Sequence, residues 1–157
     1  MKRAICPGSF DPVTIGHIDI FQRAATVFDE VYIGVFNNVR KKPLLTVAER
    51  IHLLQEALQD IPQIKVVACD GLLTDYMHQH DISVVVRGLR SVTDYEYEQS
   101  QAQLTKALHP DLDTIFFLGK PEYGCISSSV VRELLNFQGD ISGLVPRNIA
   151  EYLQNRK

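Results

Sequence analysis

Apolar and polar residues follow two alternating patterns along this chain. Short runs that are almost wholly apolar, many of them β-branched, alternate with longer segments whose apolar residues recur every three or four positions. The first pattern predicts strands buried on both faces of a sheet, and the second predicts amphipathic helices. The predicted strands are Lys2 to Cys6, Val31 to Phe36, Ile64 to Ala68, Ile82 to Val86 and Thr114 to Leu118.

The intervals between these strands carry the helical pattern. Thr46 and Glu49 form a capping box that predicts the start of one helix. Pro146 suits the first turn of another helix, and Gly139 suits a helix exit. The apolar faces of the first two helices consist of Ile18, Phe21, Ala25 and Phe28, and of Val47, Ile51, Leu54 and Leu58. Further helices are predicted over residues 72–80, 92–108, 127–137 and 146–155.

This order of elements defines the expected fold. Strands and helices that alternate over short connections favour a doubly wound, Rossmann-like α/β fold with a five-stranded parallel sheet and right-handed crossovers. The chain has 157 residues and no linker, so residues 1–157 are expected to form a single domain. Ligands of such folds bind beyond the carboxyl ends of the strands. The segments expected there are residues 7–17, 37–45, 70–71, 87–90 and 119–129.

The first of these segments contains a glycine and a histidine at the start of a predicted helix. Backbone N–H groups at a helix N-terminus attract anions, and the imidazole of His17, next to Gly16, adds a further hydrogen-bonding group. The pair indicates phosphate chemistry, although His17 alone also fits a solvated or capping residue. Neither G-x-x-x-x-G-K-[ST] nor G-x-G-x-x-G occurs, which excludes the usual P-loop and dinucleotide sites.

Cationic side chains gather in the same segments although the chain is acidic overall. Sixteen basic and nineteen acidic residues give a formal charge of −3, which argues against a nucleic-acid partner. Locally, one segment carries Arg40, Lys41 and Lys42, a second carries Arg87 and Arg90, and a third opens a helix with Ser127, Ser128 and Ser129 before Arg132. Hydroxyl and free N–H groups at a helix start suit polyphosphate oxygens. The lysines also fit a solvated loop, and the serines a simple helix cap.

Cysteine usage and hydropathy limit the class of protein further. Cys6, Cys69 and Cys125 are widely spaced, so neither a disulfide framework nor a zinc site is expected, and a reducing compartment fits best. The apolar run at the N-terminus is too short for a signal peptide, and no later run reaches membrane-spanning length. We therefore expect a soluble, cytoplasmic protein without a membrane partner.

Two short motifs resemble those of the nucleotidyltransferase superfamily. Residues 14–17 resemble T-x-G-H, and residues 126–132 resemble I-S-S-S-x-x-R. A longer match, nearly end to end, is similar to the phosphopantetheine adenylyltransferase family and rests on residues 7–12, 41–43, 87–90 and 94–98. The resemblance implies the nucleotidyltransferase version of the Rossmann-like fold. It also implies transfer of the adenylyl group of ATP to 4′-phosphopantetheine, which gives dephospho-coenzyme A and pyrophosphate.

The resemblance also implies roles for particular residues. His17 is expected to donate to the α-phosphate in the transition state, and Lys41 and Arg87 are expected to neutralise and aim the acceptor phosphate. These three form the expected catalytic set. The expected substrate-binding residues are Ser9, Lys41, Leu73 and Arg87. The expected ATP-binding residues are Ser9, Phe10, His17, Gly88, Leu89, Arg90, Glu98, Tyr123, Gly124, Cys125, Ile126, Ser127, Ser128 and Ser129.

The same resemblance implies a cofactor and an assembly. Mg²⁺ is expected to arrive with ATP, because no cage of protein carboxylates is evident and no protein metal ligand is predicted. A homohexamer is implied by the resemblance and by no residue pattern in the chain. Glu98 also fits a solvated helix face.

Other functions remain open at this stage. A nicotinamide mononucleotide adenylyltransferase or a cytidylyltransferase would share the two short motifs but is not expected to carry the stretch from Arg87 to Glu98. A class I aminoacyl-tRNA synthetase core has a similar Gly-His signature, but this chain leaves no room for tRNA-binding domains. A module that senses ATP without turnover is the alternative from another class.

Overall fold

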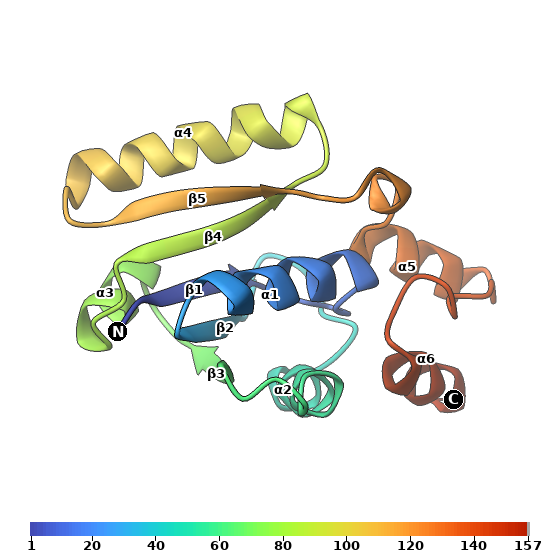
Figure 1. Ribbon diagram of the computed structural model, residues 1–157. Coiled ribbons are helices and arrows are strands. Elements are labelled where there is room, and N and C mark those ends of the chain that lie inside the picture. Colours follow the sequence, from blue (N-terminus) through green and yellow to red (C-terminus); the bar gives the residue numbers. More distant parts are fainter. Residues whose placement is uncertain (157) are drawn as a thin grey trace.

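The computed structural model describes residues 1–156 and is built around one parallel sheet with helices on both faces (Figure 1). The strand order is β3-β2-β1-β4-β5. The strands are β1 (Arg3–Gly8), β2 (Glu30–Phe36), β3 (Ile64–Cys69), β4 (Val84–Leu89) and β5 (Asp113–Leu118). The α-helices are α1 (Ile15–Val27), α2 (Val47–Ala57), α3 (Leu73–Gln79), α4 (Val92–Leu108), α5 (Ser128–Asn136) and α6 (Arg147–Asn155). A 3₁₀ turn, η1, spans Pro121–Tyr123.

Alternation of side chains along β1 divides the core into two apolar clusters. Ala4 and Cys6 belong to a large cluster that includes residues of α1, α2, α5 and α6. Ile5, between them, belongs to a smaller cluster that includes Met77 of α3. Because successive residues of a strand point to opposite faces, the two clusters lie on opposite sides of the sheet. The doubly wound fold predicted from the sequence is thus confirmed.

The edge strands correct one part of the sequence prediction. We expected all five strands to be buried on both faces, but β3 and β5 are mostly half-buried or exposed. They lie at the two edges of the sheet, where only one neighbouring strand is present. The strand bounds also shift: β1 and β4 begin later than predicted, at Arg3 and Val84, and both extend further at their carboxyl ends. In particular, β4 runs on to Leu89, so Arg87 and Gly88 belong to the strand and not to the loop behind it.

The helices follow the predicted pattern with small shifts at their ends. The helix predicted over 92–108 is confirmed at both bounds, and the capping box of Thr46 and Glu49 is present. Pro146, predicted inside a first turn, is instead the N-cap of α6. At the exit of α5, Gln138 adopts the left-handed conformation with φ of 59°, and Gly139 follows it with its N–H bonded to the carbonyl of Leu134.

The sheet opens between its two central strands. β1 and β4 pair over only two positions, Ala4 with Val84 and Ile5 with Val85, whereas β1 pairs with β2 along all six of its residues. Beyond Ile5 the strands β1 and β4 separate toward their carboxyl ends. The strand order also reverses at this point, since β2 and β3 lie on one side of β1 and β4 and β5 on the other. A ligand site is expected at such a switch point.

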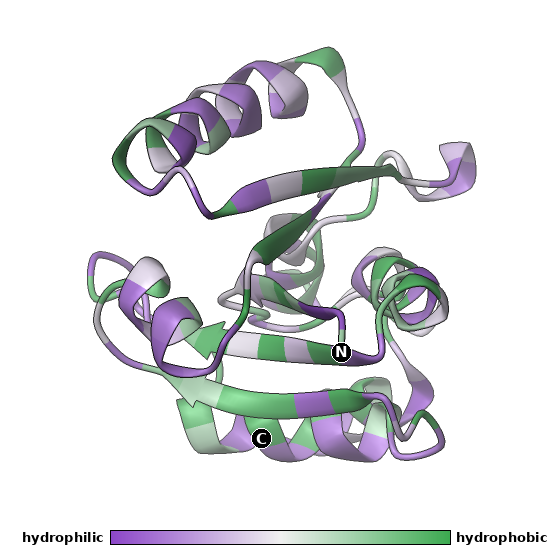
Figure 2. Cartoon of the chain, turned by 60° about the vertical axis from the view of Figure 1, so that its left-hand side comes forward, coloured by the Kyte–Doolittle hydropathy of each residue, from purple (hydrophilic) through white to green (hydrophobic). Residues whose placement is uncertain are grey.

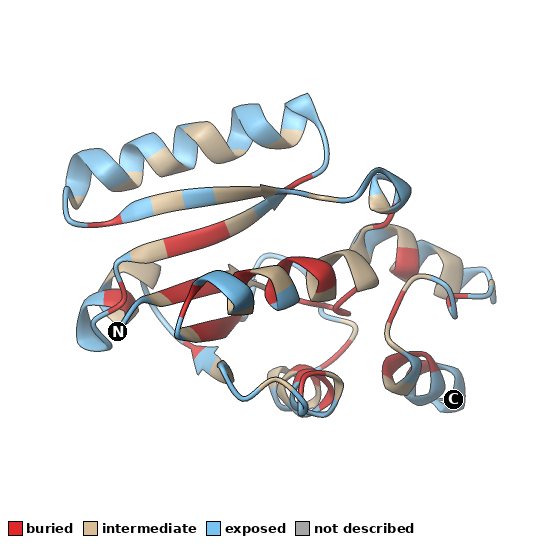
Figure 3. Cartoon of the chain, in the orientation of Figure 1, coloured by how far each residue is buried: buried red, intermediate tan, exposed pale blue. Residues whose placement is uncertain are grey.

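Helix α4 differs from the other helices. Its contacts with the sheet run to β4 and β5, and none of its residues is buried (Figure 3). Green apolar and purple polar residues alternate along it in Figure 2. The exposed apolar side chains of α4 and β5 are Val92, Tyr95, Tyr97, Leu104, Leu108, Ile115 and Leu118. Within residues 1–156, no helix combines the length and apolar character needed to cross a membrane.

Candidate active site

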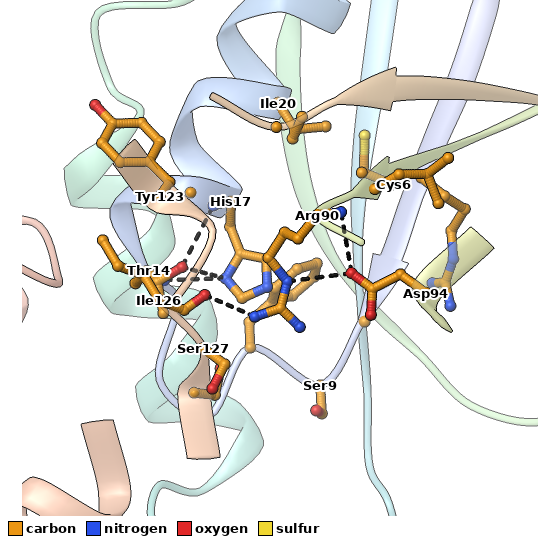
Figure 4. Close-up of a pocket in the computed structure, with 18 of the residues that line it drawn as sticks. Cys6, Ser9, Thr14, His17, Ile20, Arg90, Asp94, Tyr123, Ile126 and Ser127 are labelled. Atoms are coloured by element: carbon orange, nitrogen blue, oxygen red, sulfur yellow. Dashed lines mark hydrogen bonds and ion pairs between the residues drawn. The ribbon is translucent and has the colours of Figure 1, made fainter. Parts of the chain in front are cut away.

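A cavity of about 370 Å³ occupies the opening between β1 and β4. Its walls come from segments far apart in the sequence: the end of β1 and the turn behind it, the start of α1, Lys41, the end of β4, two residues of α4, and residues 119–132 around the start of α5 (Figure 4). Four of the five segments expected at the carboxyl edge of the sheet therefore meet here. The segment at residues 70–71 contributes no lining residue.

His17 is held by the cap of α1. The side chain of Thr14 accepts a hydrogen bond from the backbone N–H of His17, and Nδ1 of His17 accepts one from the backbone N–H of Thr14 at 3.0 Å. The imidazole thus takes the place of the Glu or Gln in a capping box. Because Nδ1 is an acceptor, the proton of the neutral ring is on Nε2. No acceptor for Nε2–H is found among residues 1–156, so it is available to a ligand.

The surroundings of His17 keep it uncharged. Burial, together with the positive charges of the Arg90 and Arg87 guanidinium groups, lowers the pKa of the imidazole to about 4. Figure 4 shows the ring beside the guanidinium of Arg90. The ring of Phe10 packs edge-on against the imidazole of His17, with 5.2 Å between the ring centroids. At neutral pH, His17 is a fixed neutral donor.

Arg87 bridges the gap between the two central strands. Its Nη1 donates to the carbonyl of Pro7 on β1 at 2.8 Å, where a backbone ladder would otherwise continue. Its Nε and Nη2 donate to the two carboxylate oxygens of Glu98, at 2.8 and 2.9 Å. A guanidinium has five N–H donors, so two remain for a ligand. Glu98, from α4, therefore orients the cation of β4.

Arg90, the residue directly after β4, is held in a similar way. Its Nη1 donates to the carbonyl of Ile126 at 2.8 Å, and its Nε lies 3.3 Å from a carboxylate oxygen of Asp94. The same carboxylate accepts from the backbone N–H of Arg90. These contacts tie the end of β4 to the segment before α5. They place a cation beside His17.

The start of α5 supplies the opposite wall. Ser127 is the N-cap and accepts from the backbone N–H of Val130, while Ser128 donates to the carbonyl of Pro12 at 2.7 Å. Arg132 donates to the carbonyl of Asp11 and to the hydroxyl of Ser129. The helix N-terminus is thereby fixed against the turn that follows β1. The O–H of Ser128 is used in this contact, whereas the hydroxyls of Ser127 and Ser129 act here only as acceptors. Their O–H groups and the free N–H groups of the helix start suit an anionic ligand.

Most of the predicted site residues line this cavity, and three do not. The lining residues are Ser9, Phe10, His17, Lys41, Arg87, Gly88, Leu89, Arg90, Glu98, Tyr123, Ile126, Ser127, Ser128 and Ser129. Leu73 instead packs against the smaller apolar cluster. Gly124 is the C-cap of η1, and the side chain of Cys125 is exposed. The structure therefore does not bring these three residues into the cavity.

Sequence reasoning missed several lining residues as members of the site. Asp94 and Arg132 stood within the quoted motifs, so charge inside a motif was the available signal. Cys6 and Ile20 line the cavity from a strand and a helix and looked like ordinary core residues. Burial raises the pKa of the Cys6 thiol to about 12, so this thiol is neutral and is no nucleophile.

The cavity is poor in ligands for a metal ion. Within residues 1–156, no group of three or more His, Cys, Asp and Glu side chains is placed to hold one. The two carboxylates of the cavity, Asp94 and Glu98, are both paired with arginines. Such a site fits a divalent cation whose oxygen ligands come mainly from a bound phosphate ligand and water.

Comparison with known proteins agrees with this geometry. Residues 5–134 match the cytidylyltransferase-like family. A crystal structure assigned as a nicotinate-nucleotide adenylyltransferase from Vibrio parahaemolyticus superposes with a TM-score of 0.74 and 18% identity, over 99% of this chain and 93% of that one. At that identity the likeness establishes the fold. Fold, family match and site together define a nucleotidyltransferase of the Rossmann-like type.

Curated relatives define the particular family. The phosphopantetheine adenylyltransferase of Dictyoglomus thermophilum is 46% identical over 156 residues, which cover 99% of this chain and 95% of the relative. That of Shouchella clausii is 48% identical over 154 residues, which cover 98% of this chain and 97% of the relative. The chain belongs to the phosphopantetheine adenylyltransferase family.

Proposed function

We propose that this protein transfers the adenylyl group of ATP to 4′-phosphopantetheine and releases pyrophosphate, with dephospho-coenzyme A as the second product. Near-full-length relatives that carry the name phosphopantetheine adenylyltransferase support this function. The structural observation that carries it is the arrangement of His17. A neutral ring donor, fixed by backbone contacts, stands among arginines and a serine-rich helix start.

The reaction needs no general base. An oxygen of the acceptor phosphate is already ionised at neutral pH, and it forms the new bond to the α-phosphorus of ATP. The bond from that phosphorus to the oxygen bridging to the β-phosphorus breaks, and pyrophosphate leaves with the electron pair. The protein therefore has to position two anions and to stabilise the charge on the transferring group. No Ser-His-Asp arrangement is required.

His17 fits the role of a donor to the transferring phosphoryl group. Its Nε2–H is fixed before the substrates arrive, because Nδ1 is already bonded to Thr14. A donor that is in place beforehand costs no reorganisation when charge develops in the transition state. We assign His17 to the α-phosphate of ATP.

Lys41 and Arg87 fit the acceptor phosphate. Lys41 lines the cavity from the loop after β2, and Arg87 lines it from β4 with two N–H donors still unused. The serines at the start of α5, with Arg132, fit the pyrophosphate end of ATP. In-line displacement requires the acceptor and the leaving group to bind on opposite sides of the α-phosphorus.

We propose MgATP as the nucleotide substrate. The phosphate oxygens would hold most of the coordination sphere of Mg²⁺, since Asp94 and Glu98 are engaged with arginines. The ion would reduce repulsion between the two anionic substrates.

We further propose a homohexamer that works in the cytoplasm. Support for self-association comes from the exposed apolar face of α4 and β5, where Val92, Leu108 and Leu118 are 74%, 66% and 73% exposed. Apolar faces of this kind mark interaction surfaces. The widely spaced, unpaired cysteines are consistent with a reducing compartment.

An acceptor panel tests the proposed function. The protein is incubated with ATP and Mg²⁺ and with 4′-phosphopantetheine, nicotinamide mononucleotide, nicotinate mononucleotide or no acceptor, and pyrophosphate and the adenylylated product are measured. We expect both products with 4′-phosphopantetheine alone. Turnover confined to a mononucleotide would contradict the acceptor assignment, and ATP binding without pyrophosphate release would favour an ATP-sensing module.

A further inference from the structure

A second, smaller cavity of about 80 Å³ lies next to the candidate active site. The turn that carries Ser9 and Asp11 forms one of its walls, and the loop of residues 37–43 with Arg50 of α2 forms others. Ser9, Lys41 and Arg132 line both cavities. The two spaces therefore share residues and lie side by side.

Arg50 is the unusual residue of this second cavity. Its side chain is buried, with the residue only 2% exposed, yet it pairs with no carboxylate of residues 1–156. Nε donates to the carbonyls of Leu45 and Thr46, and Nη1 donates to the carbonyls of Ser9 and Phe36. No acceptor for Nη2 is found within the described chain. Among the described residues no fully buried side-chain atom lacks a hydrogen-bond partner, so Nη2 is open to the cavity. A nearly buried guanidinium without a counter-ion favours an anion at the donor that it keeps free.

The other charged groups of the cavity do not supply that anion. Asp11 is the one carboxylate in its lining, and both of its oxygens already accept backbone N–H groups, from Leu44 and Leu45, at 2.8 Å. Four cationic side chains line the cavity together with this single carboxylate: Lys41, Lys42, Arg50 and Arg132. The local charge is therefore strongly positive in a chain that is acidic overall.

We propose that this cavity is a second oxyanion subsite, which takes an anion of the phosphate class on Nη2 of Arg50 and the ammonium group of Lys42. A tetrahedral oxyanion has the size and the acceptor oxygens to use donors that converge from several sides, and a guanidinium fork suits it. The binding itself does not depend on the adenylyl-transfer reaction. Which anion binds there does rest on the proposed function. Pyrophosphate released in the adjacent larger cavity and free inorganic phosphate share this chemistry.

The test measures phosphate binding to the full chain by calorimetry, with AMP present to fill the nucleotide α-phosphate position of the larger cavity. Phosphate can also bind at the proposed acceptor position on Lys41 and Arg87, so binding in the second cavity is measured as the difference between the wild type and the variants below. We expect saturable binding of inorganic phosphate to the wild type. Lys42→Ala should weaken it by about fivefold or more, because a charge-assisted hydrogen bond is lost. Arg40→Ala is the matched control: it removes a cation from the same loop, but Arg40 does not line the cavity. The phosphate affinity of the Arg40→Ala protein should stay within about twofold of the wild-type value.

Arg50→Lys provides a second variant that keeps the positive charge and loses the forked donor. It should weaken phosphate binding by about tenfold in protein whose melting curve is cooperative. Two further arms identify the source: pyrophosphate replaces phosphate, or α,β-methylene-ATP replaces AMP. Phosphate binding that survives the ATP analogue assigns the subsite to a free anion, and binding that it abolishes assigns the subsite to the terminal phosphates of the nucleotide.

Two results would overturn the proposal. The first is equal phosphate affinity in the Lys42→Ala and Arg40→Ala proteins. The second is no saturable phosphate binding in the tens of millimolar range. Neither result depends on turnover, so a failure here is distinguishable from a failure of the proposed adenylyl transfer.

Discussion

His17 illustrates, at the scale of a residue, how one side chain serves both folding and chemistry. Its Nδ1 completes the cap of α1, and the same bond leaves the proton on Nε2. The Gly-His pair could be located from the sequence because it follows a buried strand. The charge of His17 could not be predicted from the sequence, because the helix N-terminus lowers the pKa of the imidazole and a bound phosphate raises it. Three-dimensional burial beside Arg90 and Arg87 resolves the question for the free protein in favour of the neutral form.

The pH behaviour of His17 follows from this environment. Its pKa in the folded protein is about 4, below the ordinary value of 6.5. The unfolded chain therefore binds the extra proton first, and the free energy of unfolding loses a contribution as the pH falls from 6.5 toward 4. An NMR titration of the free protein should give a His17 midpoint near 4. A midpoint at or above 6 would contradict the neutral-donor assignment.

The proposed acceptor contact of Lys41 gives a separate prediction. Lys41→Ala should raise KM for 4′-phosphopantetheine by about tenfold or more, because one charge-assisted contact to the acceptor phosphate is lost. The Kd for ATP should change by less than about threefold. Steady-state kinetics and calorimetry check the two quantities, with Arg40→Ala as the control. A change confined to ATP binding would move Lys41 to the nucleotide.

At the scale of elements, the site depends on strands that separate. β1 and β4 pair at two positions only, and Arg87 bridges the space beyond them. Periodicity predicted both strands and placed their ends at one sheet edge. Residue spacing could not predict where the pairing of β1 and β4 stops, because that is a tertiary feature of the folded chain. The resemblance assigns Leu73 to substrate, and the structure places it against the smaller apolar cluster; its contact with substrate stays a prediction.

Gly88 tests the packing of α1 against β4. A Cβ atom at this position would lie 2.9 Å from Cγ1 and 3.3 Å from Cδ1 of Ile20. Gly88→Ala should therefore lower the free energy of unfolding by about 1–3 kcal/mol. The effect should be smaller in an Ile20→Ala background, where the opposing atoms are absent. Denaturant unfolding of the four proteins in this cycle gives the coupling, and additive effects would rule out the steric explanation.

At the scale of the molecule, the order of elements brings segments far apart in the sequence to the carboxyl edge of the sheet. The sequence predicts this, because the carboxyl ends of parallel strands lie at the same edge. The two sides of the sheet were not equally predictable. The large cluster under α1, α2, α5 and α6 follows from amphipathic spacing. The exposed apolar face of α4 and β5 does not follow from that spacing. None of the residues of α4 is buried within this chain, so the sequence does not show what packs against the helix.

The proposed homohexamer can be tested through that face. Leu104 lies on α4 with 55% exposure, and Leu104→Glu should lower the mass measured by light scattering, since a charge would be buried between subunits. Phe137→Glu is the control, because Phe137 is 80% exposed at the end of α5, away from α4 and β5. The wild type is expected at six times the mass of one chain. A wild-type monomer, or an equal loss of mass in both variants, would contradict the assignment of this face.

The most direct test of the whole account is pyrophosphate release from ATP and Mg²⁺ by wild type, His17→Ala and Thr14→Ala. Thr14→Ala removes the side-chain cap of α1 but keeps the imidazole and its backbone contact. We predict release that depends on 4′-phosphopantetheine in the wild type. In His17→Ala we predict a fall in kcat of about 100-fold or more with nearly unchanged ATP affinity, and in Thr14→Ala a much smaller fall. Absence of release from the wild type, or near-normal kcat in His17→Ala, would contradict the account.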